Sequence, residues 1–226
     1  MADPTITVRR DFPRPDTALL APLRDVPVCW LVDAMGRKAA LDTAIRPLTR
    51  RRHIFGTALT IDASPRDHTT PWAALAFARS GDVVVIRTQQ QEPHAICGDV
   101  ILTMAKNAGV VGLVTDGFVR DIAGIEPLDF AVFARGTSPN SPSLAGPCSI
   151  GLPVVLGGVA IDSGDLVVAD EEGVAIVPQA RLAETAAALD AVRDKEARME
   201  QAVKAGQRVP DWVEAALSSS RVRYLD

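Results

Sequence analysis

Residues 98–121 decide the fold, and they read GDVILTMAKNAGVVGLVTDGFVRD. The first half predicts a helix over 99–108, with Asp99 as its cap candidate and Gly98 directly before it. Glycine at that position lets a ligand approach the unpaired N–H groups of the first turn, although any capped helix has such a turn. The second half predicts a buried strand over 110–115, so helix and strand together indicate parallel α/β layering.

Outside this stretch, short runs of Val, Ile, Leu and Ala between turn residues predict the other strands. They lie at residues 58–61, 83–86, 131–134, 154–156, 166–169 and 174–177. Further helices are predicted over 28–35, 72–79 and 179–205. The last strands have no helix between them, and Glu171-Glu172-Gly173 is typical of a hairpin turn, so this part should be antiparallel. We expect one α/β domain over 1–226, with a mixed sheet, helices on its faces and a long C-terminal helix.

The composition narrows the class of protein. The chain has 226 residues, 47% of them hydrophobic, and a net charge of -4 without a basic block, so we expect no nucleic-acid partner. Cys29, Cys97 and Cys148 form no CxxC pair, which predicts neither a disulfide framework nor a zinc site. The N-terminal segment lacks a signal-peptide core, and the longest apolar run, 152–161, is too short to span a bilayer. These features predict a cytoplasmic protein without membrane contact.

The predicted C-terminal helix carries an apolar stripe that needs a partner surface. Its members are Leu182, Leu189, Val192, Met199 and Val203. Position 196 falls on the same stripe but holds a glutamate, and a carboxylate buried there without a partner is costly. Glu196 therefore either lies at the edge of the stripe, or meets a cation or hydrogen-bond donor.

Arg120 and Asp121 follow the predicted strand over 110–115, beyond the strand end where ligands collect in open α/β sheets. Arginine offers a rigid two-pronged donor suited to a carboxylate or keto acid. Aspartate offers a hard oxygen suited to Mg²⁺ or Mn²⁺. The pair is therefore a candidate substrate clamp and metal ligand, and the alternative is a solvent-exposed turn.

These residues carry a family resemblance. The run GDVILTMAKNAGVVGLVTDGFVRDIAGI, followed by FARGTSPNSP and GDLVVADEEGVAIVP, resembles the RraA-like/4-hydroxy-4-methyl-2-oxoglutarate aldolase family. The resemblance extends from about Val28 to Gly206, and Gly98 lies 22 residues ahead of Arg120, as in the family. It implies an α/β/α fold of the phosphohistidine-domain type, with a core over about 28–178. It also implies a homotrimer or dimer of trimers with sites near the subunit interfaces.

The resemblance assigns roles to individual residues. In the family, a four-residue block binds the pyruvyl part of the substrate through backbone amides. Here that block is Gly98, Asp99, Val100 and Ile101. The family's arginine contacts substrate and its aspartate holds a divalent metal largely through water, which makes Arg120 and Asp121 the catalytic pair. In the aldolases the C-terminal helix, here 179–206, packs on a neighbouring subunit and supplies a carboxylate, for which Glu196 is the nearest candidate.

The implied function is a class II pyruvate aldolase that depends on Mg²⁺ or Mn²⁺. Its substrate would be a 4-hydroxy-2-oxo diacid of the 4-hydroxy-4-methyl-2-oxoglutarate or 4-carboxy-4-hydroxy-2-oxoadipate type, with oxaloacetate decarboxylation as a side activity. The alternative is a non-enzymatic regulator that binds RNase E, as the family's namesake does. Proteins of the namesake type lack the extended C-terminal helix, which favours the enzyme.

Three features near the block leave questions open. Residues 89–94 read QQQEPH where aldolases often carry an Arg or Ser, which puts the identity of the substrate in doubt. His94 is a lone histidine, more typical of a surface or core position than of a base. Cys97 is either a nucleophile or a small buried thiol, and the second is the more common case.

Overall fold

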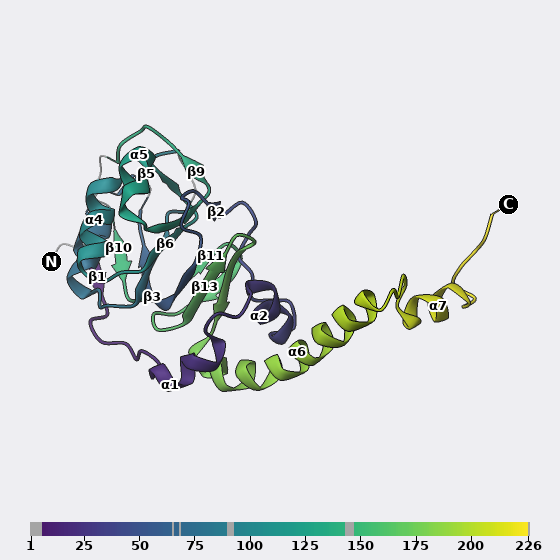
Figure 1. Cartoon of the computed structure of the whole chain (residues 1–226). Helices are drawn as coiled ribbons and strands as arrows, with labels where there is room; N and C mark the ends of the chain where they lie inside the picture. Colours follow the sequence, from purple (N-terminus) through teal and green to yellow (C-terminus); the bar gives the residue numbers. More distant parts are fainter. Residues whose placement is uncertain (1–5, 65, 68, 90–92, 143–146, 226) are drawn as a thin grey trace.

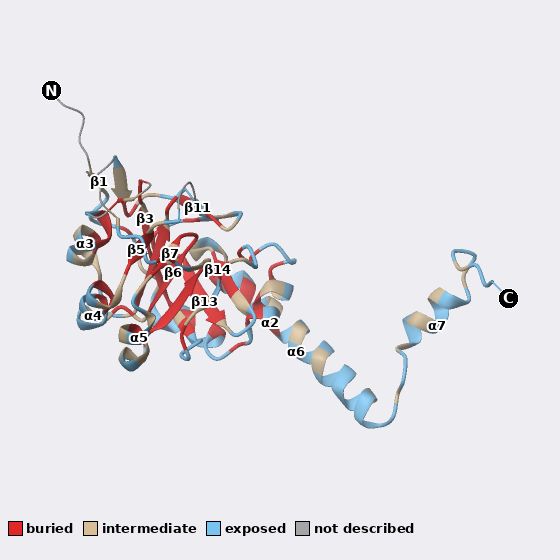
Figure 2. Cartoon of the chain, turned by 90° about the horizontal axis from the view of Figure 1, so that it is seen from above, coloured by how far each residue is buried: buried red, intermediate tan, exposed pale blue. Residues whose placement is uncertain are grey.

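The computed structural model describes residues 6–64, 66–67, 69–89, 93–142 and 147–225. A mixed sheet with the strand order β1-β10-β3-β4-β6-β8-β2 forms its centre, and β13 and β14 extend it from β3. Helices α3, α4 and α5 lie on one side of this sheet, while α2 and α6 lie on the other (Figure 1, Figure 2). The expected α/β fold with a mixed sheet and a long C-terminal helix is confirmed.

Four parallel strands make the middle of the sheet. They are β3 (Ile54–Asp62), β4 (Asp82–Arg87), β6 (Gly112–Thr115) and β8 (Ala131–Ala134). The helices between them are α3 (Thr70–Ala74), α4 (Asp99–Asn107) and α5 (Ile122–Ile125). Because both faces of these strands are covered, their sequences are almost continuously apolar rather than alternating.

The later strands are antiparallel, as expected. β13 (Leu166–Asp170) and β14 (Gly173–Val177) form a hairpin in which Asp170 pairs with Gly173. β11 (Val154–Leu156) and β12 (Val159–Ile161) form a second one. Alternate residues of the first hairpin face two different cores: Val167 packs beneath the parallel strands, and Val168 packs under α2 (Val28–Ala34).

Several elements are too short to leave a periodic pattern, and the sequence did not predict them. The strands are β1 (Ile6–Val8), β2 (Arg46–Pro47), β5 (Ala95–Cys97), β7 (Phe118–Val119), β9 (Gly136–Thr137) and β10 (Cys148–Ile150). The helices are α1 (Thr17–Leu20) and α7 (Asp211–Leu217).

The helix predicted over 72–79 was wrong in its extent. α3 begins at Thr70 and is followed by a 3-10 turn, Leu75–Phe77. Ala78 is extended, and the N–H of Arg79 donates to the buried carboxylate of Asp82 at 2.8 Å, which ends the helical path. The same carboxylate forms an ion pair with Arg14, whose Nε donates to Asp82 Oδ1 at 2.8 Å.

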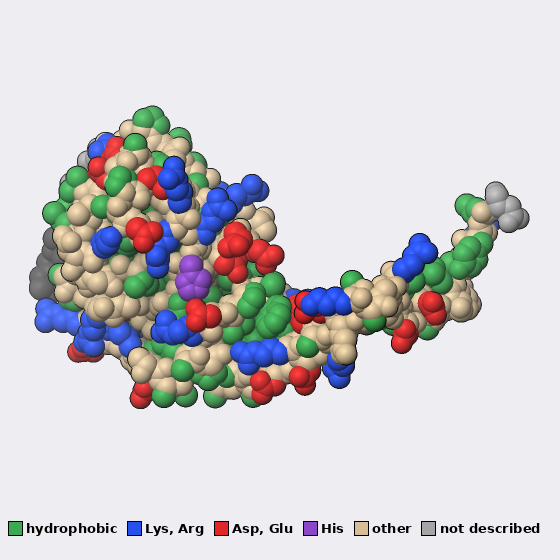
Figure 3. Space-filling model, viewed as in Figure 1, with side chains coloured by type: hydrophobic (Ala, Val, Ile, Leu, Met, Phe, Trp, Pro, Cys, Tyr) green, Lys and Arg blue, Asp and Glu red, His purple; other side chains and the backbone are tan. Residues whose placement is uncertain are grey.

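Helix α6 (Leu182–Lys204) packs on the body along its first half only. Leu182 and Leu189 are 1% and 0% exposed, whereas Met199 and Val203 are 37% and 58% exposed. The second half of the helix and α7 leave the body as an arm (Figure 1), which presents both apolar and charged side chains (Figure 3). The apolar stripe is therefore only half covered. Among the described residues, no helix has both the length and the apolar character needed to cross a membrane.

Candidate active site

A small parallel sheet carries the candidate site. Its strand order is β5-β7-β9, and each strand follows a main strand: β5 follows β4, β7 follows β6 and β9 follows β8. Gly98 comes directly after β5, and Arg120 directly after β7. Arg120 and Asp121 were expected in the turn beyond the 110–115 strand, but β7 lies between that strand and the pair. The site lies at the carboxyl ends of this second sheet, the general place for ligands in such folds.

The pocket at these strand ends has a volume of about 190 Å³. It brings together all six residues predicted at the front of helix α4 and after β7. They are Gly98, Asp99, Val100, Ile101, Arg120 and Asp121. Trp72, Ala95, Ile96, Cys97, Ser141 and Pro142 complete its lining.

Gly98 lines the pocket, and a larger residue at this position would displace the carboxylate of Asp121. A Cβ at this position would lie 2.5 Å from Asp121 Oδ2 and 3.3 Å from Arg120 Cγ. Gly98 is also the N-cap of α4, and it has no side chain to cover the first turn. Asp99 Oδ1 accepts the N–H of Val100 at 2.8 Å, and the other amides of that turn, at the positive end of the helix, remain available to an anionic ligand.

Asp121 presents its carboxylate to the pocket rather than to its own helix. It is the N-cap of α5 in the left-handed conformation, with φ 60° and ψ 37°, and its side chain makes no capping hydrogen bond. Instead, Oδ2 lies 3.0 Å from Nε of Arg120, and 40% of the side chain is exposed. The Arg120 guanidinium also donates from NH1 to Ser141 Oγ. The guanidinium is thus held on two sides.

Asp99 lines the pocket, and its carboxylate also contacts residues of α4 and α5. Its Oδ1 accepts the N–H of Val100 at 2.8 Å, and its Oδ2 lies against Gly124 of α5, where a Cβ would be 2.4 Å away. The carboxylate therefore lies between the start of α4 and α5.

The residues fit a hydrated Mg²⁺ or Mn²⁺ better than a tightly caged metal. Within the described ranges, no group of three or more His, Cys, Asp or Glu side chains is arranged to hold a metal ion. Mg²⁺ usually keeps several waters and binds through only one or two carboxylates. The half-exposed carboxylate of Asp121 suits this mode of coordination, so Asp121 is the residue that would hold such an ion.

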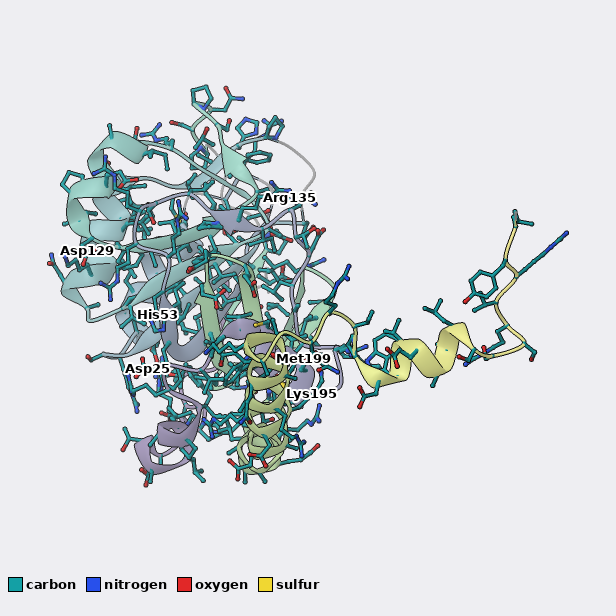
Figure 4. All side chains as sticks on the ribbon, turned by 45° about the vertical axis from the view of Figure 1, so that its right-hand side comes forward. Asp25, His53, Asp129, Arg135, Lys195 and Met199 are labelled. Carbon is teal, nitrogen blue, oxygen red and sulfur yellow. The ribbon has the colours of Figure 1, made fainter. Side chains whose placement is uncertain are left out.

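Glu196 does not line the pocket. It lies on the outer half of α6, and α6 and the pocket-forming α4 and β5 are at opposite sides of the body in both Figure 1 and Figure 2. Its carboxylate is 3.9 Å from Nζ of Lys195 and is 42% exposed, so it is an edge residue within this chain. Figure 4 labels Lys195 and Met199, which lie on the surface of the same part of the helix.

Sequence reasoning missed Trp72 and Ser141 as parts of the pocket. Ser141 belongs to the stretch TSPNSP, which follows β9 and is tied to β5 by a hydrogen bond from Ala95 N to Asn140 O at 2.9 Å. Trp72 comes from α3, between β3 and β4. Both lie far from Gly98 in sequence: the pairing of the small strands brings Ser141 to this pocket, and the packing of α3 on the main sheet brings Trp72.

Cys97 is a buried structural thiol, so the nucleophile alternative is not supported. Burial raises the pKa of Cys97 to about 12, which keeps the thiol protonated and unreactive at neutral pH. At pH 8, we expect iodoacetamide to modify the exposed Cys29 and to leave Cys97 intact, as read by peptide mass spectrometry. The same reagent in urea should modify both, and rapid modification of Cys97 in the folded protein would contradict the burial argument.

Comparison with known proteins identifies relatives of the whole pocket-bearing region. The model of the RraA-like family, described as Aldolase/RraA, matches residues 28–176. A Halalkalibacterium halodurans protein named "Putative 4-hydroxy-4-methyl-2-oxoglutarate aldolase" is 36% identical over 156 residues, 69% of this chain and 74% of that protein.

Solved structures share the fold. An uncharacterized protein from Pseudomonas syringae pv. tomato has a TM-score of 0.75 at 26% identity, over 87% of this chain and 96% of that one. Streptomyces coelicolor RraAS2, described as an unusual member of the RNase ES inhibitor RraA protein family, has a TM-score of 0.73 at 28% identity. That similarity covers 85% of this chain and 98% of RraAS2.

Proposed function

Because the chain belongs to the RraA-like family, we propose that it is a carbon–carbon lyase that cleaves a 4-hydroxy-2-oxo acid and releases pyruvate, with Mg²⁺ or Mn²⁺ as cofactor. One observation carries the proposal: the first turn of α4, the Arg120 guanidinium and the Asp121 carboxylate share one pocket. An anion site, a rigid cation and a hard-metal ligand are the groups that a 2-oxo acid requires. The diacids implied by the sequence resemblance belong to this substrate class.

The groups that line the pocket have different roles in the proposed reaction. In the block from Gly98 to Ile101, the amides other than that of Val100, which Asp99 accepts, bind the pyruvyl carboxylate. Arg120 stabilises the negative charge that develops as the C3–C4 bond breaks. A divalent cation held by Asp121 would add electrophilic stabilisation of the 2-oxo group. Decarboxylation of oxaloacetate would use the same stabilisation, which accounts for the proposed side activity.

Glu196 would act as the proton acceptor only from a neighbouring copy of the chain. Within one chain it lies on the far side of the body from the pocket, on an arm whose apolar residues are uncovered. A homotrimer or dimer of trimers, in which each arm reaches the next subunit, would supply that carboxylate. This assembly is part of the proposal.

The direct test measures pyruvate release from a panel of 4-hydroxy-2-oxo acids and oxaloacetate, with Mg²⁺ or Mn²⁺ and then with EDTA. We expect release with the metal and its loss with the chelator. A clean preparation that releases no pyruvate under any of these conditions would reject the proposal.

An RNase-binding regulator is the second candidate, favoured by the similarity to RraAS2 over most of both chains. It predicts capture of an RNase E-type endonuclease by this protein without catalysis of pyruvate release. The same assay therefore separates the two functions, and a pull-down with the endonuclease completes the comparison.

The Gly98→Ala variant tests the floor of the pocket. The added methyl group would lie 2.5 Å from Asp121 Oδ2, so the carboxylate must move. Since a misplacement of about 1 Å can cost 10²-fold in rate, we expect kcat/KM to fall by about that factor. Gly136→Ala is the matched control, because its Cβ would meet Phe118 at an ordinary 3.5 Å. Equal activity of the two variants would contradict this geometry.

A further inference from the structure

Ser141 contacts the guanidinium that lines the pocket. Its Oγ accepts a hydrogen bond from NH1 of Arg120, while Nε of Arg120 lies 3.0 Å from Asp121 Oδ2. A guanidinium has five N–H donors in one rigid plane. These two contacts therefore leave both N–H groups of NH2, and the second N–H of NH1, to a ligand in the pocket. The direction in which those donors point depends on Ser141 as well as on Asp121.

The serine loop, residues 138–141, is fixed to both neighbouring strands of the small sheet. The N–H of Ser138 donates to the carbonyl oxygen of Val119, the last residue of β7, at 2.9 Å. The carbonyl oxygen of Asn140 accepts the N–H of Ala95, the first residue of β5, at 2.9 Å. The loop therefore keeps its place relative to the strands that Gly98 and Arg120 follow.

The sequence of the loop restricts its backbone as well. Pro139 follows Ser138 and Pro142 follows Ser141, and a residue before proline is biased towards extended conformations. Within the loop, the N–H of Asn140 donates to Ser138 Oγ at 3.2 Å. The position of the Ser141 hydroxyl is therefore set by the loop itself, before any ligand binds.

The pair Arg120 and Asp121 differs in geometry from the buried pair Arg14 and Asp82. In the buried pair, Nε and NH2 of the arginine donate to the two carboxylate oxygens, at 2.8 and 2.7 Å. In the pocket pair, the contact runs through Nε, and NH1 is turned to Ser141. A guanidinium released from Ser141 would be able to turn and bind both oxygens of the aspartate. That two-pronged pair is the stronger one, but it would occupy the carboxylate and NH2 together.

We propose that Ser141 is a positioning residue, which turns the Arg120 guanidinium so that the arginine serves the substrate while the carboxylate of Asp121 stays available to a cation. The part about the substrate rests on the proposed function, whereas the part about the cation rests only on Asp121 as a metal ligand. Ser141 adds no charge and moves no proton. It acts on the transition state, because a guanidinium that is already oriented needs no rearrangement as negative charge develops.

Steady-state kinetics of the full-length Ser141→Ala protein tests the part about the substrate. With 4-hydroxy-4-methyl-2-oxoglutarate or oxaloacetate and Mg²⁺ or Mn²⁺, we expect kcat to fall about tenfold, the lower end of what a hydrogen bond to a charged group contributes. KM should change by less than about twofold, since the guanidinium keeps its charge. Ser141→Thr keeps the hydroxyl and should restore most of the rate. Ser80→Ala is the matched control, because Ser80 is exposed and precedes β4, at the end of that strand away from the pocket.

Calorimetric titration with Mn²⁺ tests the part about the cation without any turnover. Ser141→Ala should raise the dissociation constant at least about threefold, within what an exposed ion pair contributes, because the released guanidinium competes for Asp121. In an Arg120→Met background, the same substitution should change the dissociation constant by less than about twofold, because no guanidinium remains to compete. This dependence on Arg120 separates positioning from a general loss of structure.

The outcomes separate this proposal from the proposed function. An unchanged kcat or an unchanged Mn²⁺ affinity in Ser141→Ala would overturn the role of Ser141 and leave the lyase intact. A Ser141→Thr protein as slow as Ser141→Ala would also overturn it, as would a loss of Mn²⁺ affinity that persists in the Arg120→Met background. If the parent protein releases no pyruvate, the lyase proposal fails, and the Mn²⁺ titrations alone decide whether Ser141 directs Arg120. If the parent binds no Mn²⁺ either, both proposals fail.

Discussion

Asp121→Asn should lower the rate of pyruvate release by about 10²–10³-fold, the range for removal of one well-placed charge-stabilising group. The change keeps the size of the side chain but removes the negative charge that a hard cation needs. Asparagine tolerates the left-handed conformation that Asp121 adopts at φ 60°, so the backbone should remain unstrained. We expect the free energy of unfolding to change by no more than about 0.5 kcal/mol, as is usual at exposed positions.

Calorimetric titration with Mn²⁺ and the pyruvate assay together measure this effect. Asp121→Asn should weaken both metal binding and turnover, and added metal should rescue it poorly. Arg120→Lys keeps a positive charge but loses the two-pronged geometry, so it should retain metal binding while substrate binding and turnover weaken. Wild-type activity in Asp121→Asn would show that the metal is held elsewhere.

Asp82→Ala should lower the free energy of unfolding by about 3–5 kcal/mol, as removal of one partner of a buried ion pair does. The Asp82 carboxylate is fully buried and accepts hydrogen bonds from Arg14 Nε at 2.8 Å, Arg14 NH2 at 2.7 Å and Thr57 Oγ1 at 3.0 Å. The variant leaves the Arg14 guanidinium, which is 15% exposed, without its counter-charge. It also removes the contact between Arg14 of the N-terminal segment and the first residue of β4.

Urea unfolding of the purified variant and parent proteins measures the change in the free energy of unfolding. Asp190→Ala is the control, because Asp190 pairs with Arg193 on the surface of α6 with 80% of its side chain exposed. Exposed pairs contribute about 0–1 kcal/mol, so this variant should unfold almost as the parent does. A comparable loss of unfolding free energy in both variants would show that the contribution of Asp82 to stability does not depend on its burial.

The sequence predicts the fold well wherever burial leaves a pattern. β4 and β8 are apolar on both faces, and the predicted runs 83–86 and 131–134 lie within or match their observed bounds. The hairpin of β13 and β14 follows from its turn residues. Strands such as β7, with two residues, cannot show any period, so the second sheet could not be foreseen from the pattern.

The local part of the site is predictable from sequence, but the distant part is not. Gly98 and Arg120 each come directly after a strand of one small sheet, and the family resemblance, rather than a strand pattern, predicted that they meet. Trp72 and Ser141 reach the pocket through α3 and the loop after β9, and nothing in their neighbouring residues indicates it. The stripe of α6 has the same spacing as that of a buried helix, so the pattern alone did not show that its outer half is uncovered within one chain; the resemblance implied it.

Different residues stabilise the main sheet and line the candidate pocket. The Asp82 ion pair and the buried parallel strands hold the main sheet, whereas Gly98, Arg120 and Ser141 follow the strands of the small sheet and Trp72 lies on α3. Substitutions at Trp72, Val100 and Pro142 therefore leave the main hydrophobic cores untouched. These positions form a compact target for a mutant library that changes the pocket and leaves the packing of the main sheet intact.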